Sequence, residues 1–428
     1  MELEDIIMKI AMVHTPLWGR GGGERQILKL AVELQKIGHE VEIFTSAVNE
    51  ERCYPDTLKN VTVNVIPHPL EGKMPSFLTP FGARQKTLHD EGEEISFLKK
   101  WMRKNLGRQF YTIPYELPSM LNLGRKMPKG FDIINNHNFP TEWAAFFAKK
   151  RLKVPVVWMC NEPPFWFSIP ELRRGLRKIN WPLFEVLDKV AVNYIDEIVV
   201  LSRIAKERVR KVYNRSARLV RSGIDAEMFH SAKGESFRKK YDLQNDFVLL
   251  QVGNLELNKR QADSIETLYY LSKTHDHVKL VLDGGGRRDE LIRLSEKLEV
   301  GDKVLFLRTE GDEELAEVYA ACDLFVFPAQ ITWGLAVIEA MAATKPVIVS
   351  EKCGVSEIVQ SGVNGIVVDH AKPKEMAKQV ELLMNDVELR KRLGENAYEY
   401  VKNHLSWEKY AKRMERVFEQ AISVYRTP

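Results

Sequence analysis

One stretch, residues 325–350, constrains the fold of this chain more than any other. It reads FVFPAQITWGLAVIEAMAATKPVIVS: a short apolar strand ends at Pro328, a loop with Trp333 and Gly334 follows, and a helix over about residues 335–343 leads into a second apolar strand. Apolar strands joined by a helix are typical of a parallel sheet covered by helices. The amides at the start of such a helix point beyond the strand ends, where they can bind an anionic group such as a diphosphate.

The alternation of apolar strands and helices continues along most of the 428 residues. Ile10–His14 form an expected strand, a glycine-rich turn follows at residues 18–24, and a helix to about Ile37 leads into a strand at residues 40–45. This order is typical of a doubly wound sheet, and the length allows two or three domains. Further strands are expected at residues 61–66, 131–138, 154–160, 196–201, 247–252, 278–283 and 304–307. The sequence therefore predicts an α/β fold.

The composition is that of a soluble protein, with 44% hydrophobic and 29% charged residues. The four cysteines lie far apart and form no CxxC pair, so neither a zinc site nor a disulfide framework is expected. No stretch approaches the ~18 apolar residues of a membrane span, and the first residues are acidic where a signal peptide would be basic. We expect a cytoplasmic protein with no metal and no tightly bound cofactor.

The net charge of +4 is unevenly distributed along the chain. Residues 226–428 carry a net charge of −5, so residues 1–225 carry +9. Basic residues are densest at 95–130, which hold eight Lys and Arg against one acid, Glu116. A basic half and an acidic half imply different partners.

The helix after Gly334 carries a recognisable motif, in which Gly334-Leu335 is followed by Glu339-Ala-Met-Ala342. This motif resembles the core signature of the family 4 retaining glycosyltransferases (glycosyl transferases group 1), which have the GT-B fold. The family usually has another Glu eight residues before Glu339, where this chain has Ile331 beside the polar Gln330. Other motifs resemble those of the family, in the same order, along most of the chain outside residues 67–130.

The resemblance implies a GT-B fold of two facing Rossmann-like, doubly wound domains with a cleft between them. Residues 1–225 would bind the acceptor and residues 226–406 the nucleotide sugar, with a linker near residues 226–245. The last helix of the family commonly crosses back, so residues from about 407 to 428 are expected to pack on the first domain. Residues 67–130, rich in proline, aromatic and basic side chains, are expected to form an insertion.

The resemblance also implies a set of donor-binding residues. In the family an Arg and a Lys hold the donor diphosphate, because positive charge stabilises the leaving group. Lys259 matches the Lys, whereas Asn254 replaces the Arg, and Arg260 could restore the charge. The chain has no Asp-x-Asp motif for a divalent metal, so Lys259 and the helix N-terminus are expected to neutralise the diphosphate. Further donor contacts are expected at Arg308, Gln330, Trp333, Gly334, Leu335 and Glu339, of which Glu339 would bind the ribose diol.

Two features of the first half resemble the acceptor side of the family site. Gly21, Gly22 and Gly23 open a helix after the first strand, which allows a ligand to approach the backbone closely. His137 lies at the carboxyl end of an expected strand, where ligands of open α/β sheets bind. It matches the second His of a family motif whose first His is replaced by Asn135. We therefore expect His137 and Lys259 as the catalytic residues.

The resemblance implies transfer of a hexose from a nucleotide diphosphate sugar, with retention of anomeric configuration, to a saccharide in glycan assembly. The leaving phosphate would act as base, and mannose from GDP-mannose is the donor suggested by the relatives. Two alternatives stay open: a non-catalytic protein that binds a sugar nucleotide or a partner enzyme, and a sugar-nucleotide epimerase. A dinucleotide dehydrogenase ranks below these, because the glycine runs lack the spaced GxGxxG fingerprint.

The basic and aromatic segments 95–130 and 165–182 predict contact with a membrane surface and a polyprenyl-linked acceptor. The alternatives are basic helices packed on their own domain, and a soluble acceptor. Nucleic acid can also bind such segments. We expect none here, because no nucleic-acid motif is present and the overall charge is modest.

Overall fold

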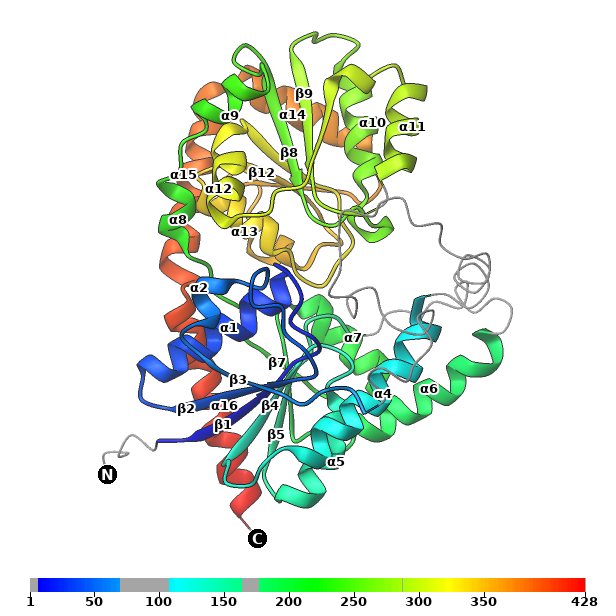
Figure 1. Cartoon of the computed structure of the whole chain (residues 1–428). Helices are drawn as coiled ribbons and strands as arrows, with labels where there is room; N and C mark the ends of the chain where they lie inside the picture. Colours follow the sequence, from blue (N-terminus) through cyan, green and yellow to red (C-terminus); the bar gives the residue numbers. More distant parts are fainter. Residues whose placement is uncertain (1–6, 70–107, 164–176, 287, 428) are drawn as a thin grey trace. The chain divides into compact units, whose positions relative to one another are not determined.

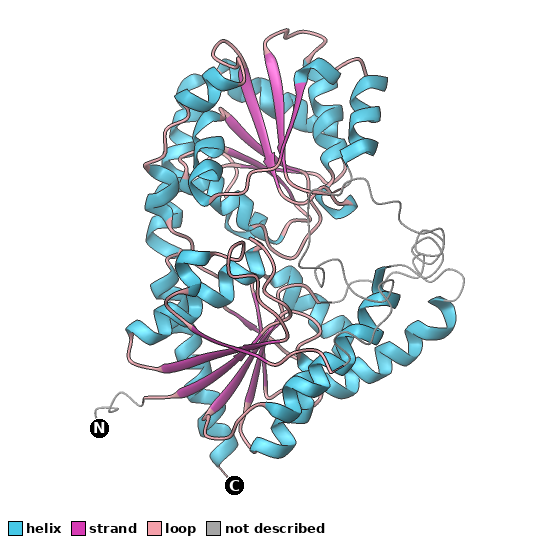
Figure 2. Cartoon of the chain, in the orientation of Figure 1, coloured by secondary structure: helices cyan, strands magenta, loops and turns pink. Residues whose placement is uncertain are grey.

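The computed structural model describes residues 7–69, 108–163, 177–286 and 288–427; at residues 108–115 and 177–184 it describes only the backbone. The chain divides into two compact units. The first comprises Met1–Val200, Lys206–Val220 and Ala411–Pro428, and the second Leu201–Ala205 and Arg221–Tyr410. Each unit has one parallel sheet with helices on its faces (Figure 1, Figure 2).

Seven parallel strands form the sheet of the first unit, in the order β3-β2-β1-β4-β5-β6-β7. β1 pairs with β2 on one side and with β4 on the other. Residues 10–13 of β1 are all buried, which is typical of a strand covered on both faces. The strands are β1 Lys9–Val13, β2 Glu40–Thr45, β3 Thr62–Val65, β4 Ile133–His137, β5 Val156–Met159, β6 Glu197–Val200 and β7 Arg218–Leu219.

The helices of the first unit connect these strands in the usual β-α-β manner. They are α1 Gly22–Lys36, α2 Pro55–Leu58, α4 Arg108–Lys126, α5 Glu142–Leu152, α6 Arg177–Val192 and most of α7 Arg203–Tyr213. α4 packs against α5, where a Cβ on Gly124 would lie 2.4 Å from the carbonyl oxygen of Ala144. Residues 108–126 thus form a helix between β3 and β4, while residues 70–107 of the expected insertion lie outside the described residues.

The last helix, α16 Trp407–Arg426, belongs to the first unit from Ala411 onward. Polar contacts attach it to the sheet and its loops. His39 Nε2 lies 3.0 Å from Glu415 Oε1, Arg426 lies 3.1 Å from Asp132 Oδ1, and Arg218 donates to Gln420 Oε1.

Six parallel strands form the sheet of the second unit, in the order β10-β9-β8-β11-β12-β13. The apolar side chains of one face, such as Leu249, Leu280 and Val326, are fully buried in a core shared with α10 and α14. The strands are β8 Phe247–Val252, β9 Val278–Asp283, β10 Val304–Leu307, β11 Leu324–Phe327, β12 Val347–Ser350 and β13 Ile366–Val368.

Helices form two layers around this second sheet (Figure 1). One layer holds α10 Gln261–Leu271, α11 Arg288–Lys297 and α14 Pro373–Asn385; the other holds α8 Ala226–His230, α9 Glu235–Lys240, α12 Asp312–Ala321, α13 Leu335–Ala342 and α15 Val387–His404. Short 3-10 turns occur at Leu257–Lys259, Gly301–Lys303 and Gly354–Ile358.

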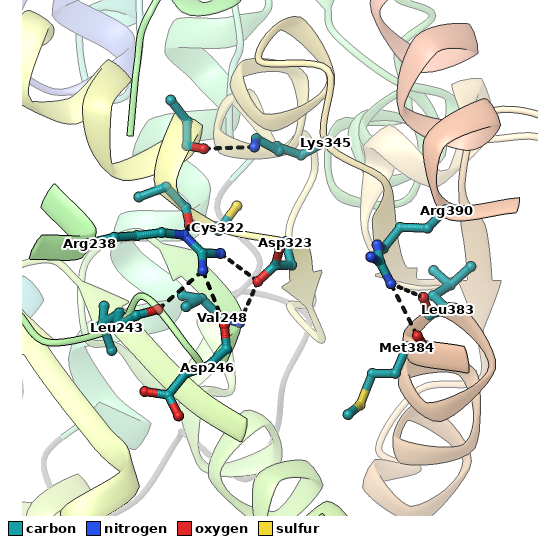
Figure 3. Close-up of polar contacts among 12 residues, drawn as sticks. Arg238, Leu243, Asp246, Val248, Cys322, Asp323, Lys345, Leu383, Met384 and Arg390 are labelled. Carbon is teal, nitrogen blue, oxygen red and sulfur yellow. Dashed lines mark hydrogen bonds and ion pairs between the residues drawn. The ribbon is translucent and has the colours of Figure 1, made fainter. Parts of the chain in front are cut away.

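Residues 226–245 are not a linker, contrary to the sequence prediction. They form α8 and α9, which bury Phe229 and Phe237 against the second unit. Arg238 donates to Asp323 Oδ2 at 2.6 Å, to the carbonyl of Ala321 at 2.8 Å and to two further carbonyls (Figure 3). The many charges of this segment predicted a solvated linker. The guanidinium of Arg238 instead donates hydrogen bonds to the segments just before β8 and β11.

The predicted α/β architecture is confirmed, with one doubly wound parallel sheet in each unit (Figure 2). The segment at about residues 325–350 forms β11, α13 and β12, within one or two residues of the expected bounds. Among the described residues, no helix has the length and hydropathy needed to cross a membrane.

Candidate functional site

The strand order of the second unit reverses between β8 and β11. The chain runs outward from β8 to β10, then returns to β11 and continues in the opposite direction. Ligands of such sheets bind beyond the carboxyl ends of the strands at this point. The loops after β8, β9 and β11 are therefore the candidate donor site.

Two glycine turns pack against each other at this edge. Gly253 follows β8 with a φ of 142°, and Gly284 follows β9 with a φ of 157°. A Cβ on Gly284 would lie 2.2 Å from the carbonyl oxygen of Gly253, and Leu255 N–H donates to the carbonyl of Gly285 at 2.8 Å. Both the backbone conformation and the close contact require glycine at position 284.

Lys259 places a cation next to the strand reversal. Its Nζ lies 5.7 Å from the ring centroid of Phe327, the last residue of β11. Its Cε and Cδ lie 3.8–3.9 Å from the position a Cβ would take on Gly253. Gln251 Nε2 donates to the carbonyl of Lys259 at 2.8 Å and so fixes the backbone of this residue. Lys259 is therefore positioned between the turn after β8 and the end of β11.

Arg260 is engaged differently from the sequence expectation. Its guanidinium makes two hydrogen bonds to the carboxylate of Asp263, at 2.6 and 2.8 Å. A bidentate pair of this kind compensates the charge of the guanidinium locally. Arg308 is exposed, and its guanidinium lies against Gly285, within 3.7–3.8 Å of the Cβ position.

The turn after β12 contacts the loop before α13 and fixes its backbone. Gly354 N–H donates to the carbonyl of Ile331 at 2.9 Å, and a Cβ on Gly354 would lie 1.7 Å from the carbonyl oxygen of Thr332. Cys353 Sγ lies 3.4 Å from the carbonyl of Trp333. Gly334 then forms the N-cap of α13, and Leu335 and Ala336 occupy its first turn, whose amides an anion can bind.

The two carboxylate positions of the family motif have different surroundings. Glu339 is 5% exposed, and its Oε2 accepts a hydrogen bond from Tyr319 Oη at 2.8 Å. Ile331, at the other position, is buried, whereas its neighbour Gln330 is exposed. The Gln330 N–H donates to the carbonyl of Asn258 at 2.8 Å, which ties this loop to the one that carries Lys259.

His137 in the first unit is fully buried. Its Nε2 lies 2.7 Å from Asn135 Oδ1, and burial, together with the nearby His14, holds the pKa of the ring well below its usual value. The ring is therefore neutral at physiological pH. Its role in contacting substrate stays a prediction.

The glycine loop at the start of α1 is closely surrounded. A Cβ on Gly23 would lie 2.4 Å from Asn138 Nδ2, and one on Gly21 would lie 2.3 Å from Glu24 Oε2. Tyr54 Oη donates to the carbonyl of Gly21 at 3.2 Å. Larger residues at positions 21 and 23 would therefore displace the polar side chains that line this loop.

Several polar residues near this loop were not predicted as site residues from the sequence. His14 follows β1, Asn138 follows β4 and Asn161 follows β5, and Gln26 lies in the second turn of α1. A chain of hydrogen bonds joins all four. Their positions just after neighbouring parallel strands were the available signal, since such strand ends meet at one edge of a sheet.

The sequence matches two families that together span most of the chain. Residues 233–400 match glycosyl transferases group 1, and residues 89–228 match Glycosyltransferase Family 4. The chain belongs to glycosyltransferase family 4. The family resemblance of the sequence motifs is thereby confirmed, and so is the GT-B class of its two sheets.

Named relatives of this glycosyltransferase are distant. A glycosyltransferase of Methanocaldococcus jannaschii is 26% identical, with 97% of this chain and 99% of the relative covered. The N-acetyl-alpha-D-glucosaminyl L-malate synthase of Bacillus anthracis is 24% identical over 78% of this chain and 91% of that protein. The crystal structure of Anabaena HepE in complex with UDP-glucose superposes with a TM-score of 0.71 at 17% identity, covering 96% of this chain and 100% of HepE.

Proposed function

We propose that this glycosyltransferase transfers a hexose from a nucleoside diphosphate sugar to a hydroxyl of a saccharide or lipid-linked saccharide, with retention of anomeric configuration. The observation that carries the proposal is the position of Lys259 beside the end of β11, the strand that precedes the N-terminus of α13. A lysine and unpaired helix amides at a strand reversal suit a diphosphate. The named activities of the relatives, and the UDP-glucose bound by HepE, support a sugar-nucleotide donor.

In the proposed reaction the bond between C1 of the sugar and the diphosphate oxygen breaks. A bond between C1 and the acceptor oxygen forms on the same face, and the acceptor proton passes to the leaving phosphate. Lys259 and the first amides of α13 would stabilise the charge that develops on the diphosphate. Glu339 would bind the ribose diol and Arg308 the outer part of the nucleotide, with the exposed Gln330 next to the sugar.

The experiment is a turnover assay with UDP-, GDP- and ADP-hexoses, GDP-mannose included, in which the release of nucleoside diphosphate is measured. Lys259→Ala should lower kcat/KM by roughly 10²-fold, the usual effect of removing one group that stabilises developing charge. Lys378→Ala, an exposed lysine of α14 paired with Glu375, is the matched control. The coupling constant of the new anomeric proton reports retention or inversion. Equal rates of nucleoside diphosphate release in the wild type and in Lys259→Ala would contradict the proposed site.

The buried Ile331 makes a non-catalytic protein the second candidate function. Such a protein would bind a sugar nucleotide without turnover. Under our proposal the adjacent Gln330 contributes the polar contact instead, so Gln330→Ala should raise the KM for the donor sugar nucleotide while leaving the affinity for the nucleoside diphosphate unchanged. Nucleotide binding without turnover, across a panel of sugar donors and acceptors, would favour the second candidate.

A lipid-linked acceptor at a membrane surface is supported by an exposed apolar cluster on α6. Val186, Leu187 and Val190 are 57%, 43% and 44% exposed. Residues 95–107 and 165–176 of the two basic segments lie outside the described residues. We expect the full chain to float with anionic liposomes, and the triple change of the cluster to Ser to reduce this several-fold. Val424→Ser, on α16, is the control at another exposed position. Absence of flotation with the wild type would favour a soluble acceptor.

A further inference from the structure

Asp283 lies at the carboxyl edge of the second sheet, where three loops begin next to one another. It is the last residue of β9, and its register partners are Val252 on β8 and Leu307 on β10. Both partners are also the last residues of their strands. The main-chain carbonyl of Asp283 accepts a hydrogen bond of 2.9 Å from Gly253 N–H, in the loop after β8. Asp283 therefore joins its own turn to the loops of both neighbouring strands.

Two hydrogen bonds fasten the loop after β10, residues 308–311, on either side of Arg308. Gly284 N–H donates to the carbonyl of Leu307 at 3.1 Å. Thr309 N–H donates to the side chain of Asp283, at 2.9 Å from Oδ1. The main chain of Arg308 lies between these two bonds, so it cannot shift without breaking one of them. Only the second of the two depends on a side chain, and that side chain is the carboxylate of Asp283.

The surroundings of this carboxylate suit a role toward the loop. Asp283 is 3% exposed. Burial raises the pKa of its carboxyl group, and the negative charge of Glu314 on α12 also raises it. The amide and hydroxyl of Thr309 oppose this shift, because hydrogen bonds to a carboxylate favour its charged form. A carboxylate repels a diphosphate, so at this edge it is better suited to holding protein amides than to touching the donor.

We propose that Asp283 is a positioning residue of the donor site, which holds residues 308–311 so that Arg308 can contact the nucleotide. This inference rests on the proposed function, because it concerns the nucleotide-binding loop of that same reaction. The affinity for a ligand falls in proportion to the fraction of molecules whose loop is correctly placed. Asp283 thus raises the affinity for the donor through Arg308, without itself touching the ligand.

The test is a calorimetric titration of the full-length protein with whichever of UDP, GDP and ADP binds the wild type most tightly. Asp283→Ala should weaken this binding about tenfold, because the Thr309 amide loses its acceptor. Asp283→Asn should weaken it only about threefold, because the amide oxygen still accepts but carries no charge. Asp276→Ala, which changes an exposed aspartate just before β9, should leave the affinity unchanged.

A double-mutant cycle separates positioning of Arg308 from a general structural effect. In an Arg308→Ala background, Asp283→Ala should weaken binding further by less than about twofold, because residues that act through each other are not additive. The same tenfold loss in both backgrounds overturns the inference. Chemical denaturation shows whether Asp283→Ala is folded. For an unfolded variant the cycle is run with Asp283→Asn, and an equal threefold loss in both backgrounds overturns the inference.

The donor-site variant Lys259→Ala distinguishes failure of this inference from failure of the proposed function. Nucleotide binding that Lys259→Ala weakens, but that neither change at Asp283 weakens, overturns this inference alone. Nucleotide binding that is unchanged in Arg308→Ala also overturns it, because Asp283 then has no contact to position. Absence of nucleotide binding by the wild type overturns the proposed function, and this inference with it.

Discussion

The hydroxyl of Tyr319 donates a hydrogen bond of 2.8 Å to Oε2 of Glu339, and both side chains are buried. Tyr319 lies on α12 and Glu339 on α13, so one helix fixes the carboxylate of the other. We expect Tyr319→Phe to raise the KM for the donor about fivefold to tenfold with little change in kcat, because the loss of one hydrogen bond to a charged group reorients the carboxylate. Steady-state kinetics with varied donor measures this. A fall in kcat at constant donor KM would assign the pair a different role.

Tyr54 holds the glycine loop of the first unit in a comparable way. Its hydroxyl donates to the carbonyl of Gly21 and accepts from Arg25 Nε, both at 3.2 Å. Tyr54→Phe removes both contacts, and we expect a several-fold higher KM for the acceptor while the KM for the donor stays constant. Tyr269→Phe, on α10 of the second unit, is the control. Equal changes in both KM values would show that the loop does not act on the acceptor selectively.

Gly284→Ala should disrupt the donor site, because the new Cβ would lie 2.2 Å from the carbonyl oxygen of Gly253 and the φ of 157° disfavours any side chain. We expect a loss of about 2 kcal/mol or more in stability and a loss of nucleotide binding. Gly311→Ala is the control, since a Cβ there would meet nothing within 4 Å. Chemical denaturation and nucleotide titration measure the two effects. Unchanged nucleotide affinity would separate the glycine turns from the donor site.

Glu142 on α5 and Asp188 on α6 form a buried pair of carboxyl groups. Tyr213 Oη donates to Asp188 Oδ2 at 2.6 Å. Burial raises the pKa of Asp188 to about 6 and that of Glu142 well above its usual value. The folded protein therefore binds protons that the unfolded chain releases above about pH 4, so stability falls as pH rises from about 4 through the folded pKa of each group.

We expect Glu142→Gln to reduce this loss of stability between pH 5 and pH 8, because the amide has no proton to release as the pH rises. Urea unfolding of wild type and variant at both pH values measures the difference. Glu399→Gln, on the exposed face of α15, should follow the wild type. A variant whose pH dependence matches the wild type would mean that the pair is not protonated in the folded state.

The architecture was predictable because apolar strands and glycine turns are local signals. The stretch that became β11, α13 and β12 shows this, since its strands are uninterrupted apolar runs between breakers. The failure at residues 226–245 has a physical cause. A charged segment looks solvated, and the pairing of Arg238 with Asp323, 85 positions later, cannot be read from composition.

The candidate site was less predictable for the same reason. Whether a charged side chain can meet a ligand depends on its neighbours in space, as the pairing of Arg260 with Asp263 shows. His137 ended a strand as expected, yet its burial follows from tertiary packing. Gln26, Asn138 and Asn161 are ordinary amides in sequence, and only their hydrogen bonds to one another and to His14 single them out.

The most direct test of the donor site is a calorimetric titration of wild type and Lys259→Ala with UDP, GDP and ADP. We predict that the wild type binds one of these nucleotides with clear preference, and that Lys259→Ala weakens that binding by about tenfold or more while Lys378→Ala does not. Equal affinity in the Lys259 and Lys378 variants would contradict the assignment of the diphosphate to Lys259 and the start of α13.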